Sequence, residues 1–170
     1  LAGRAFIEWL GAPAGWRWLD VGCGNGAFTE MLIEHCAPAA VHGIDPSAAQ
    51  IAYARARTTT HMAEFQQGNA MALPFADHTF DAAVMPLVIA FVPDPAKGVA
   101  EMVRVVRPGG LVAAYMWDQA GGGFPYHALM TEMRSMGIDI PSPPCPQSSR
   151  VDVLTQLSRD AGLDGVAARA

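Results

Sequence analysis

A glycine-rich turn between an apolar run and a helical pattern is the feature that most constrains this chain. The stretch "WLDVGCGNGAFTE" places Gly22, Gly24 and Gly26 at every second position, directly after the apolar run 17–21. Glycine forfeits side-chain packing and loses the most backbone freedom on folding, so three at one turn need a reason. A strand, such a turn and a helix together present backbone N–H groups and the positive end of the helix dipole. The pattern predicts close approach of a ligand, and a tight turn without a ligand is the alternative.

Length and composition indicate one domain over residues 1–170 with a single buried core. The chain is 51% hydrophobic and 16% charged, and its net charge of −5 comes without any basic block. A nucleic-acid partner is therefore disfavoured. The longest uncharged apolar run, 82–92, is too short to span a bilayer. Three cysteines without CxxC spacing predict no metal site and favour a cytoplasmic location.

Short apolar runs alternate with helical patterns along the chain, which is typical of a parallel α/β sheet. Strands are expected at 17–21, 39–45, 63–67, 80–85 and 111–117, and helices at 27–36, 46–57 and near 125–136. A further helix places apolar residues at i, i+3, i+4 and i+7, namely Val99, Met102, Val103 and Val106. The proline–glycine segment 107–110 is expected to end it.

The last third of the chain has a different texture. Residues 118–149 combine loop, a short helix and a proline-rich loop, and we expect them to form a lid or acceptor-site insertion. A last helix should turn Val151, Leu154 and Leu157 inward. The final residues, 163–170, resemble the start of a sixth strand. The chain, or its ordered part, is therefore expected to end before the domain's C-terminal strands are complete.

An acidic residue ends the second expected strand. Asp45 lies 19 residues after Gly26. A carboxylate at this place can accept hydrogen bonds from both hydroxyls of a ribose, as in nucleoside-binding α/β folds. The alternative is an N-cap for the following helix, with Pro46 at the first helical position.

Three further segments complete a family pattern. They are "GNA" (68–70), "LPFADHTFDAAVM" (73–85) and "VPDPAKGVAEMVRVVRPGGLVA" (92–113). In this order and spacing, residues 17–117 resemble the class I S-adenosylmethionine-dependent methyltransferases. They are most similar to the small-molecule branch that includes ubiquinone and menaquinone biosynthesis enzymes. The resemblance implies a doubly wound, mostly parallel Rossmann-like sheet flanked by helices.

The resemblance also implies roles at the glycine turn. Asp20 would face the cationic amino group of the methionine moiety of S-adenosylmethionine. The backbone of Gly22, Cys23 and Gly24 would lie against the methionine and ribose portions. Asp45 would hold the ribose hydroxyls. No residue near Cys23 in the sequence would make its thiol a nucleophile.

The adenine side of the expected pocket comes from later segments. The resemblance places Pro46 near the adenine and includes Gly68, Asn69 and Ala70 among the cofactor-binding residues. Relatives usually carry aspartate where this chain has Asn69, whose carbonyl oxygen can still accept a hydrogen bond from the adenine amino group. Met85 would line the opposite side of the pocket, with an ordinary core methionine as the alternative.

The resemblance implies methyl transfer from S-adenosylmethionine to a small-molecule acceptor, but it assigns no catalytic residue. Many relatives carry histidines where this chain has Ala90 and Phe91, and His127 and Tyr126 are more typical of a solvated helix. The alternative function is a catalytically silent module that binds S-adenosylmethionine or S-adenosylhomocysteine. NAD binding is disfavoured because the glycine spacing is GxGxG rather than GxGxxG. The sequence indicates neither the acceptor nor the oligomeric state.

Overall fold

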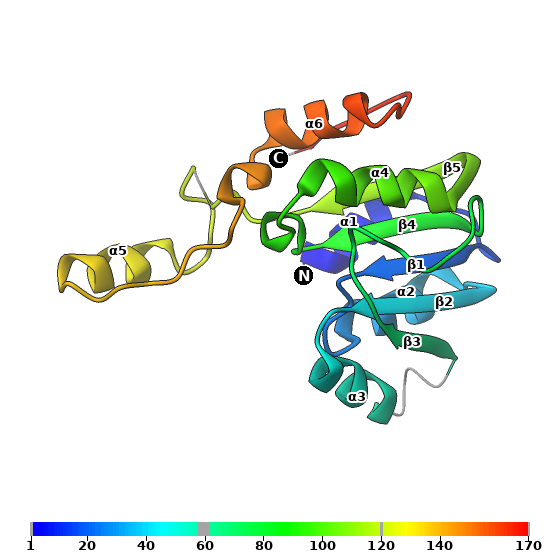
Figure 1. Cartoon of the computed structure of the whole chain (residues 1–170), viewed down its shortest axis with the longest axis horizontal. Helices are drawn as coiled ribbons and strands as arrows, with labels where there is room; N and C mark the ends of the chain where they lie inside the picture. Colours follow the sequence, from blue (N-terminus) through cyan, green and yellow to red (C-terminus); the bar gives the residue numbers. More distant parts are fainter. Residues whose placement is uncertain (1, 58–61, 120, 170) are drawn as a thin grey trace.

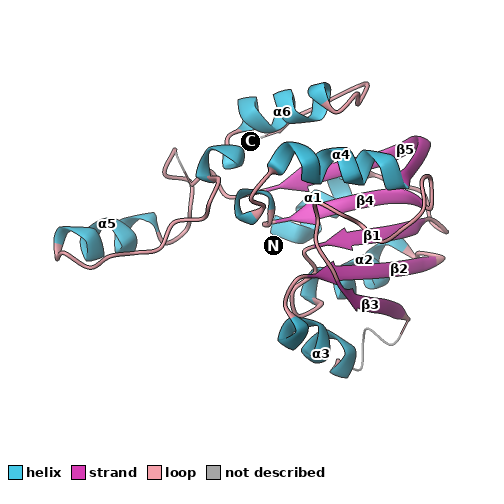
Figure 2. Ribbon diagram, in the orientation of Figure 1, coloured by secondary structure: helices cyan, strands magenta, loops and turns pink. Residues whose placement is uncertain are grey.

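A five-stranded parallel sheet with the order β3-β2-β1-β4-β5 forms the centre of the molecule (Figures 1 and 2). The computed structural model describes residues 2–57, 62–119 and 121–169. The strands are β1 (Arg17–Val21), β2 (Ala40–Asp45), β3 (Ala63–Gln67), β4 (Phe80–Pro86) and β5 (Val106–Tyr115). The order runs outward from β1 in one direction and then resumes on its other side, so the sheet is doubly wound. The expected Rossmann-like α/β fold is confirmed.

Helices lie on both faces of this sheet, and one further helix, the fifth, extends away from it (Figure 2). They are α1 (Ala2–Leu10), α2 (Ala27–Cys36), α3 (Ala48–Ala56), α4 (Pro95–Val105), α5 (His127–Ser135) and α6 (Val151–Asp160), with 3₁₀ turns η2 (Ile89–Phe91) and η3 (Pro146–Ser149). Helix α1 has no counterpart among the helices expected from sequence, and it buries Phe6 and Ile7 against the sheet layer. No helix in the described part of the chain is long and apolar enough to cross a membrane.

Each face of the sheet carries its own hydrophobic core. On one face, Leu19 and Val21 of β1 cluster with side chains of β4 and α4, and Leu157 of α6 packs on them. On the other face, Trp18 clusters with Leu32 of α2 and with α1. Successive strand residues point to opposite faces, so β1 is buried on both sides and reads as a continuous apolar run.

Two helix boundaries differ from those expected. Ser47 is the N-cap of α3, and its Oγ accepts a hydrogen bond from the Gln50 N–H at 3.3 Å. Pro46 therefore precedes the helix instead of opening it. Helix α4 ends at Val105, and Val106 is the first residue of β5 rather than the last position of the helical stripe.

The proline–glycine segment 107–110 was expected between a helix and a strand, but it lies inside β5. The pairing of β5 with β4 shifts register there, between Phe80 and Ala82. A Cβ on Gly110 would lie 2.5 Å from the Asp81 carbonyl oxygen. The segment therefore stays paired to β4 through a bulge that only a residue without a side chain permits.

The C-terminal region follows the expectation only in part. Leu154 and Leu157 pack on the core as expected, whereas Val151 is 44% exposed. Residues 163–169 form no strand, so the sixth strand inferred from sequence is wrong for them. Gly165 adopts a left-handed backbone with φ of 63°, which interrupts the extended run.

Replacing Leu32 by alanine should lower the free energy of unfolding by about 2–5 kcal/mol, because its side chain is fully buried between the sheet and α2. Urea denaturation of both proteins measures the difference. Leu129→Ala is the matched control, since Leu129 on α5 is 57% exposed. Equal losses in the two variants would contradict the core assignment.

Candidate functional site

A cavity of about 250 Å³ lies at the carboxyl ends of the strands, where the strand order reverses. The turns after β1, β2 and β3 and the segment after β4 all contribute to it. The lining residues are Gly22, Ile44, Asp45, Pro46, Gly68, Asn69, Ala70, Val88, Phe91, Val92 and Pro93. The structure thus brings together six of the residues named from sequence: Gly22, Asp45, Pro46, Gly68, Asn69 and Ala70.

The glycine turn is fixed both by backbone conformation and by close packing. Gly22 has φ of 76°, and its N–H donates to the Ile44 carbonyl oxygen at 2.7 Å. A Cβ at Gly22 would lie 2.5 Å from a methyl carbon of Val88. At Gly24, with φ of 52°, a Cβ would meet nothing within 4 Å. The missing side chain at Gly22 therefore makes room for Val88. At Gly24 it leaves the backbone open on the side where a Cβ would lie.

Asp45 joins this turn to the end of β2. Its Oδ2 accepts from the Gly24 N–H at 3.0 Å, and its Oδ1 accepts from the Ser47 N–H at 2.8 Å. The helix cap is Ser47, so the N-cap alternative for Asp45 is wrong. A carboxylate has about four acceptor positions, and these two bonds leave capacity for a ligand's hydroxyl groups.

Asp20 is a buried carboxylate with one unpartnered oxygen. Its Oδ2 accepts from the Thr29 hydroxyl at 2.6 Å, whereas Oδ1 has no hydrogen-bond partner within the described structure. Burial raises the pKa of this carboxyl to about 7, and the nearby charge of Asp45 contributes in the same direction. An ionised carboxylate in such a place is costly unless a cation or donor meets it. The unpartnered oxygen therefore fits a cationic ligand group.

Asn69 opens a tight turn at the edge of the cavity. Its Oδ1 accepts from the Met71 N–H at 2.9 Å, and its carbonyl oxygen accepts from the Ala72 N–H at 3.0 Å. An amide oxygen has two lone pairs, so the turn leaves Oδ1 one further acceptor position.

Comparison with known proteins identifies one family for this chain. Residues 19–114, more than half of the chain, match the family described as "Methyltransferase domain". The chain belongs to this methyltransferase family. The family membership expected from the glycine turn and the segments after it is confirmed.

Individual relatives are identical to this chain at about a third of the aligned residues. An uncharacterized protein of Mycobacterium bovis is 33% identical over 119 residues, 70% of this chain and 43% of that protein. A demethylmenaquinone methyltransferase of Renibacterium salmoninarum is 33% identical over 129 residues, 76% of this chain and 52% of that protein. The solved structure of an S-adenosylmethionine dependent methyltransferase from Mesorhizobium loti is 27% identical with a TM-score of 0.57, over 65% of this chain and 52% of that one. The chain spans about half the length of the curated relatives it matches.

Two side chains near the turn of this methyltransferase domain belong to its core. Cys23 is buried against Ile51 and Phe65, and burial raises the pKa of its thiol above the usual range, which leaves it an unreactive thiol. Met85 is fully buried in the core cluster that contains Met102, and it does not line the cavity. The core alternative for Met85 is the one that the structure supports.

The apolar wall of the cavity was not identified from sequence. It comes from the segment after β4, where Val88, Val92 and Pro93 line the cavity and Phe91 is 55% exposed. Apolar residues give no signal that separates a cavity wall from a core. Among the described residues that line the cavity, Asp45 is the only ionisable one.

Helix α5 extends away from the sheet (Figure 1) and buries none of its residues. His127 and the 62% exposed Tyr126 are therefore solvated, as expected. The segment 118–149 returns to the domain at Cys145, whose N–H donates to the Ala90 carbonyl oxygen at 3.0 Å. Within the described ranges, no group of three or more His, Cys, Asp or Glu side chains could hold a metal ion.

Asp20→Asn should stabilise the unliganded protein progressively as the pH rises. A raised carboxyl pKa favours the folded state fully below about pH 4, and this contribution is lost as the pH rises toward 7. The difference in free energy of unfolding, variant minus wild type, should therefore grow by a few kcal/mol over that range, at about 1.4 kcal/mol per pH unit. Urea denaturation at a series of pH values measures it. A difference that is flat with pH would contradict the buried, unpartnered state of Asp20.

Proposed function

We propose that this chain is the cofactor-binding domain of an S-adenosylmethionine-dependent methyltransferase that acts on a small-molecule acceptor. The observation that carries the proposal is the pairing of two carboxylates at one glycine turn. Asp20 keeps an unpartnered buried oxygen, and Asp45 holds the Gly24 N–H beside the cavity. A ligand with a cation at one end and a ribose further along suits both groups. The family supports the same cofactor.

Each residue has a distinct part in holding this cofactor. Asp20 accepts from the ammonium group of the methionine moiety, and Asp45 accepts from the ribose hydroxyls. The turn that begins at Asn69 accepts from the adenine amino group, with Pro46 beside the ring. Gly24 offers open backbone to the chain that joins methionine and ribose.

S-adenosylmethionine supplies, when bound, a methyl group already activated by its positively charged sulfur. The protein's own task is to orient the acceptor and exclude water. Val88, Phe91 and Val92 provide an apolar wall for this purpose. Asp45, the one ionisable side chain of the described cavity lining, is proposed to hold the ribose, so no general base is assigned among these residues.

The acceptor is proposed to be a small aromatic phenol or quinol. A demethylmenaquinone methyltransferase is among the relatives, and the cavity wall beside Phe91 is apolar. The segment 118–149, which is anchored at Ala90 and carries several methionines and prolines, is proposed as the lid on the acceptor side of a single domain over 1–170. The three free cysteines support a cytoplasmic location.

Calorimetric titration with S-adenosylhomocysteine tests the cofactor site directly. Micromolar binding is expected, and Asp45→Ala should weaken it at least tenfold, about 1.4 kcal/mol. Affinity should also fall as the pH drops below about 7, because the carboxyl of Asp20 becomes protonated and no longer attracts a cation. NAD serves as the control ligand and should give no signal. Absence of S-adenosylhomocysteine binding would overturn the proposed function.

A second measurement separates an enzyme from a silent binding module. Methyl transfer from S-adenosylmethionine to a panel of phenols and quinols should yield at least one methylated product. If the cofactor binds but no phenol or quinol of the panel is methylated, the proposed acceptor class is wrong, whereas the proposed cofactor site is retained.

A further inference from the structure

The connection between β3 and β4 crosses one face of the sheet without a helix. Parallel strands are usually joined through an α-helix, whose backbone groups bond to one another. The fully described stretch 68–79 contains none, and Figure 1 shows it running across the sheet on the side of α4. Leu73 is the buried residue of this stretch, so its backbone groups need partners from elsewhere in the protein.

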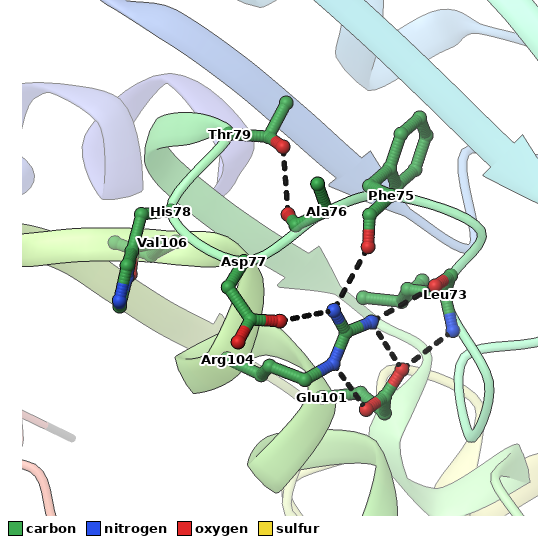
Figure 3. A network of polar contacts seen from close by, with 9 residues as sticks. All are labelled: Leu73, Phe75, Ala76, Asp77, His78, Thr79, Glu101, Arg104 and Val106. Carbon is green, nitrogen blue, oxygen red and sulfur yellow. Dashed lines mark hydrogen bonds and ion pairs between the residues drawn. The ribbon is translucent and has the colours of Figure 1, made fainter.

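Two charged side chains of α4 supply those partners (Figure 3). Arg104 donates to the carbonyl oxygens of Leu73 at 2.9 Å and Phe75 at 2.8 Å, and to the Asp77 carboxylate at 2.8 Å. Glu101 accepts from the Leu73 N–H at 2.7 Å. Both backbone groups of Leu73 are therefore held by α4.

The two side chains also hold each other. Arg104 donates to both carboxylate oxygens of Glu101, at 2.7 and 2.8 Å. Hydrogen bonds from the guanidinium lower the pKa of the Glu101 carboxyl, so the pair stays ionised. The side chains are 32% and 19% exposed, which leaves them partly shielded from water. The planar fork of arginine makes all these bonds at once, and lysine cannot reproduce them.

The residue that this pair holds, Leu73, directly follows the turn at the edge of the cavity. Residues 69–72 form the turn, and Leu73 is the next residue. The other end of the turn is tied to β2, because the Gly68 N–H donates to the Asp45 carbonyl oxygen at 3.0 Å. The position of Asn69 relative to Asp45 therefore depends on an anchor at each end.

We propose that Arg104 and Glu101 are positioning residues that set the place of the turn 69–72 and so determine affinity for the adenosine part of the ligand. This inference rests on the proposed function and deepens it. Neither side chain lines the cavity, so both act through the backbone of Leu73.

A second arginine pair in the same part of the chain provides a matched control. Arg107 donates to Asp81 at 2.6 Å, and Asp81 also accepts from the Arg17 N–H at 2.8 Å. This pair lies at the amino ends of β4 and β5, whereas the cavity lies at the carboxyl ends of the strands. Its loss affects stability without touching the turn 69–72.

The first experiment compares Arg104→Lys, Glu101→Gln and Arg107→Lys by calorimetry with S-adenosylhomocysteine and with 5′-methylthioadenosine. The first two variants should bind both ligands about tenfold more weakly. Arg107→Lys should bind both as the wild type does. Equal weakening in all three variants would show a general structural effect and overturn the inference.

A double-mutant cycle with Asn69→Ala adds a readout that a merely stabilising role would not move. If Arg104 acts through the turn, Arg104→Lys should weaken binding much less in the Asn69→Ala background than in the wild type. Full additivity would overturn the inference.

Hydrogen exchange of the unliganded protein tests the same idea without a ligand. The amides of Ala72 and Leu73 should exchange faster in Arg104→Lys and Glu101→Gln, and at the wild-type rate in Arg107→Lys. Unchanged exchange would overturn the positioning role even in a protein that binds S-adenosylhomocysteine normally. Failure of the wild type to bind that ligand would instead overturn the proposed function, and this inference with it.

Discussion

The contact between the glycine turn and the end of β2 is the constraint on which the rest of the site depends. The N–H groups of Gly22 and Cys23 both donate to the Ile44 carbonyl oxygen, at 2.7 and 3.0 Å, and the Gly24 N–H donates to Asp45. These bonds fold the chain back over the neighbouring strand at the point where the strand order reverses. Two carboxylates, one at each strand end, are thereby brought close together, so that burial raises the pKa of Asp20 and the charge of Asp45 adds to this effect. The sheet topology produces the crevice, and the hydrogen bonds of the turn bring the two carboxylates together beside it.

That arrangement works against the stability of the unliganded fold. Trp18 and Leu19 of the same strand are fully buried among apolar side chains, whereas Asp20 next to them is buried with an unpartnered oxygen. A carboxylate in such surroundings binds its proton more tightly than in the unfolded chain, and near neutral pH the folded state loses the difference. Binding sites commonly retain groups that destabilise the free protein. The apolar cores on both faces of the sheet offset the destabilising effect of the Asp20 carboxylate.

The sequence predicted those parts that depend on local pattern. The apolar runs predicted all five strands, and the glycine spacing with Asp45 predicted which strand ends meet at the cavity. Apolar character alone cannot separate core from cavity wall, so Met85 was assigned to the pocket and Phe91 was not. The cap at Ser47 has a local signal, a serine three residues before Gln50, which the preference of proline for the first helical position outweighed in the prediction. The bulge at 107–110 depends on which neighbour pairs with the backbone there, and no local pattern reports that. The contacts of Arg104 join residues about thirty positions apart, and they are equally invisible to periodicity.

Helix α4 relates the two sides of the cavity to each other. Just before its first turn, Val92 and Pro93 line the apolar wall, and near its last turn Arg104 holds the segment that follows the Asn69 turn. Along the helix, Val99, Met102 and Val105 are buried in the core. A packed helix moves as a unit more readily than it bends, because its core side chains interdigitate with the sheet. A crossover with its own helix would have satisfied its backbone internally. By relying on side chains of α4 instead, this fold ties the adenine edge of the cavity to the same rigid element that carries its apolar wall.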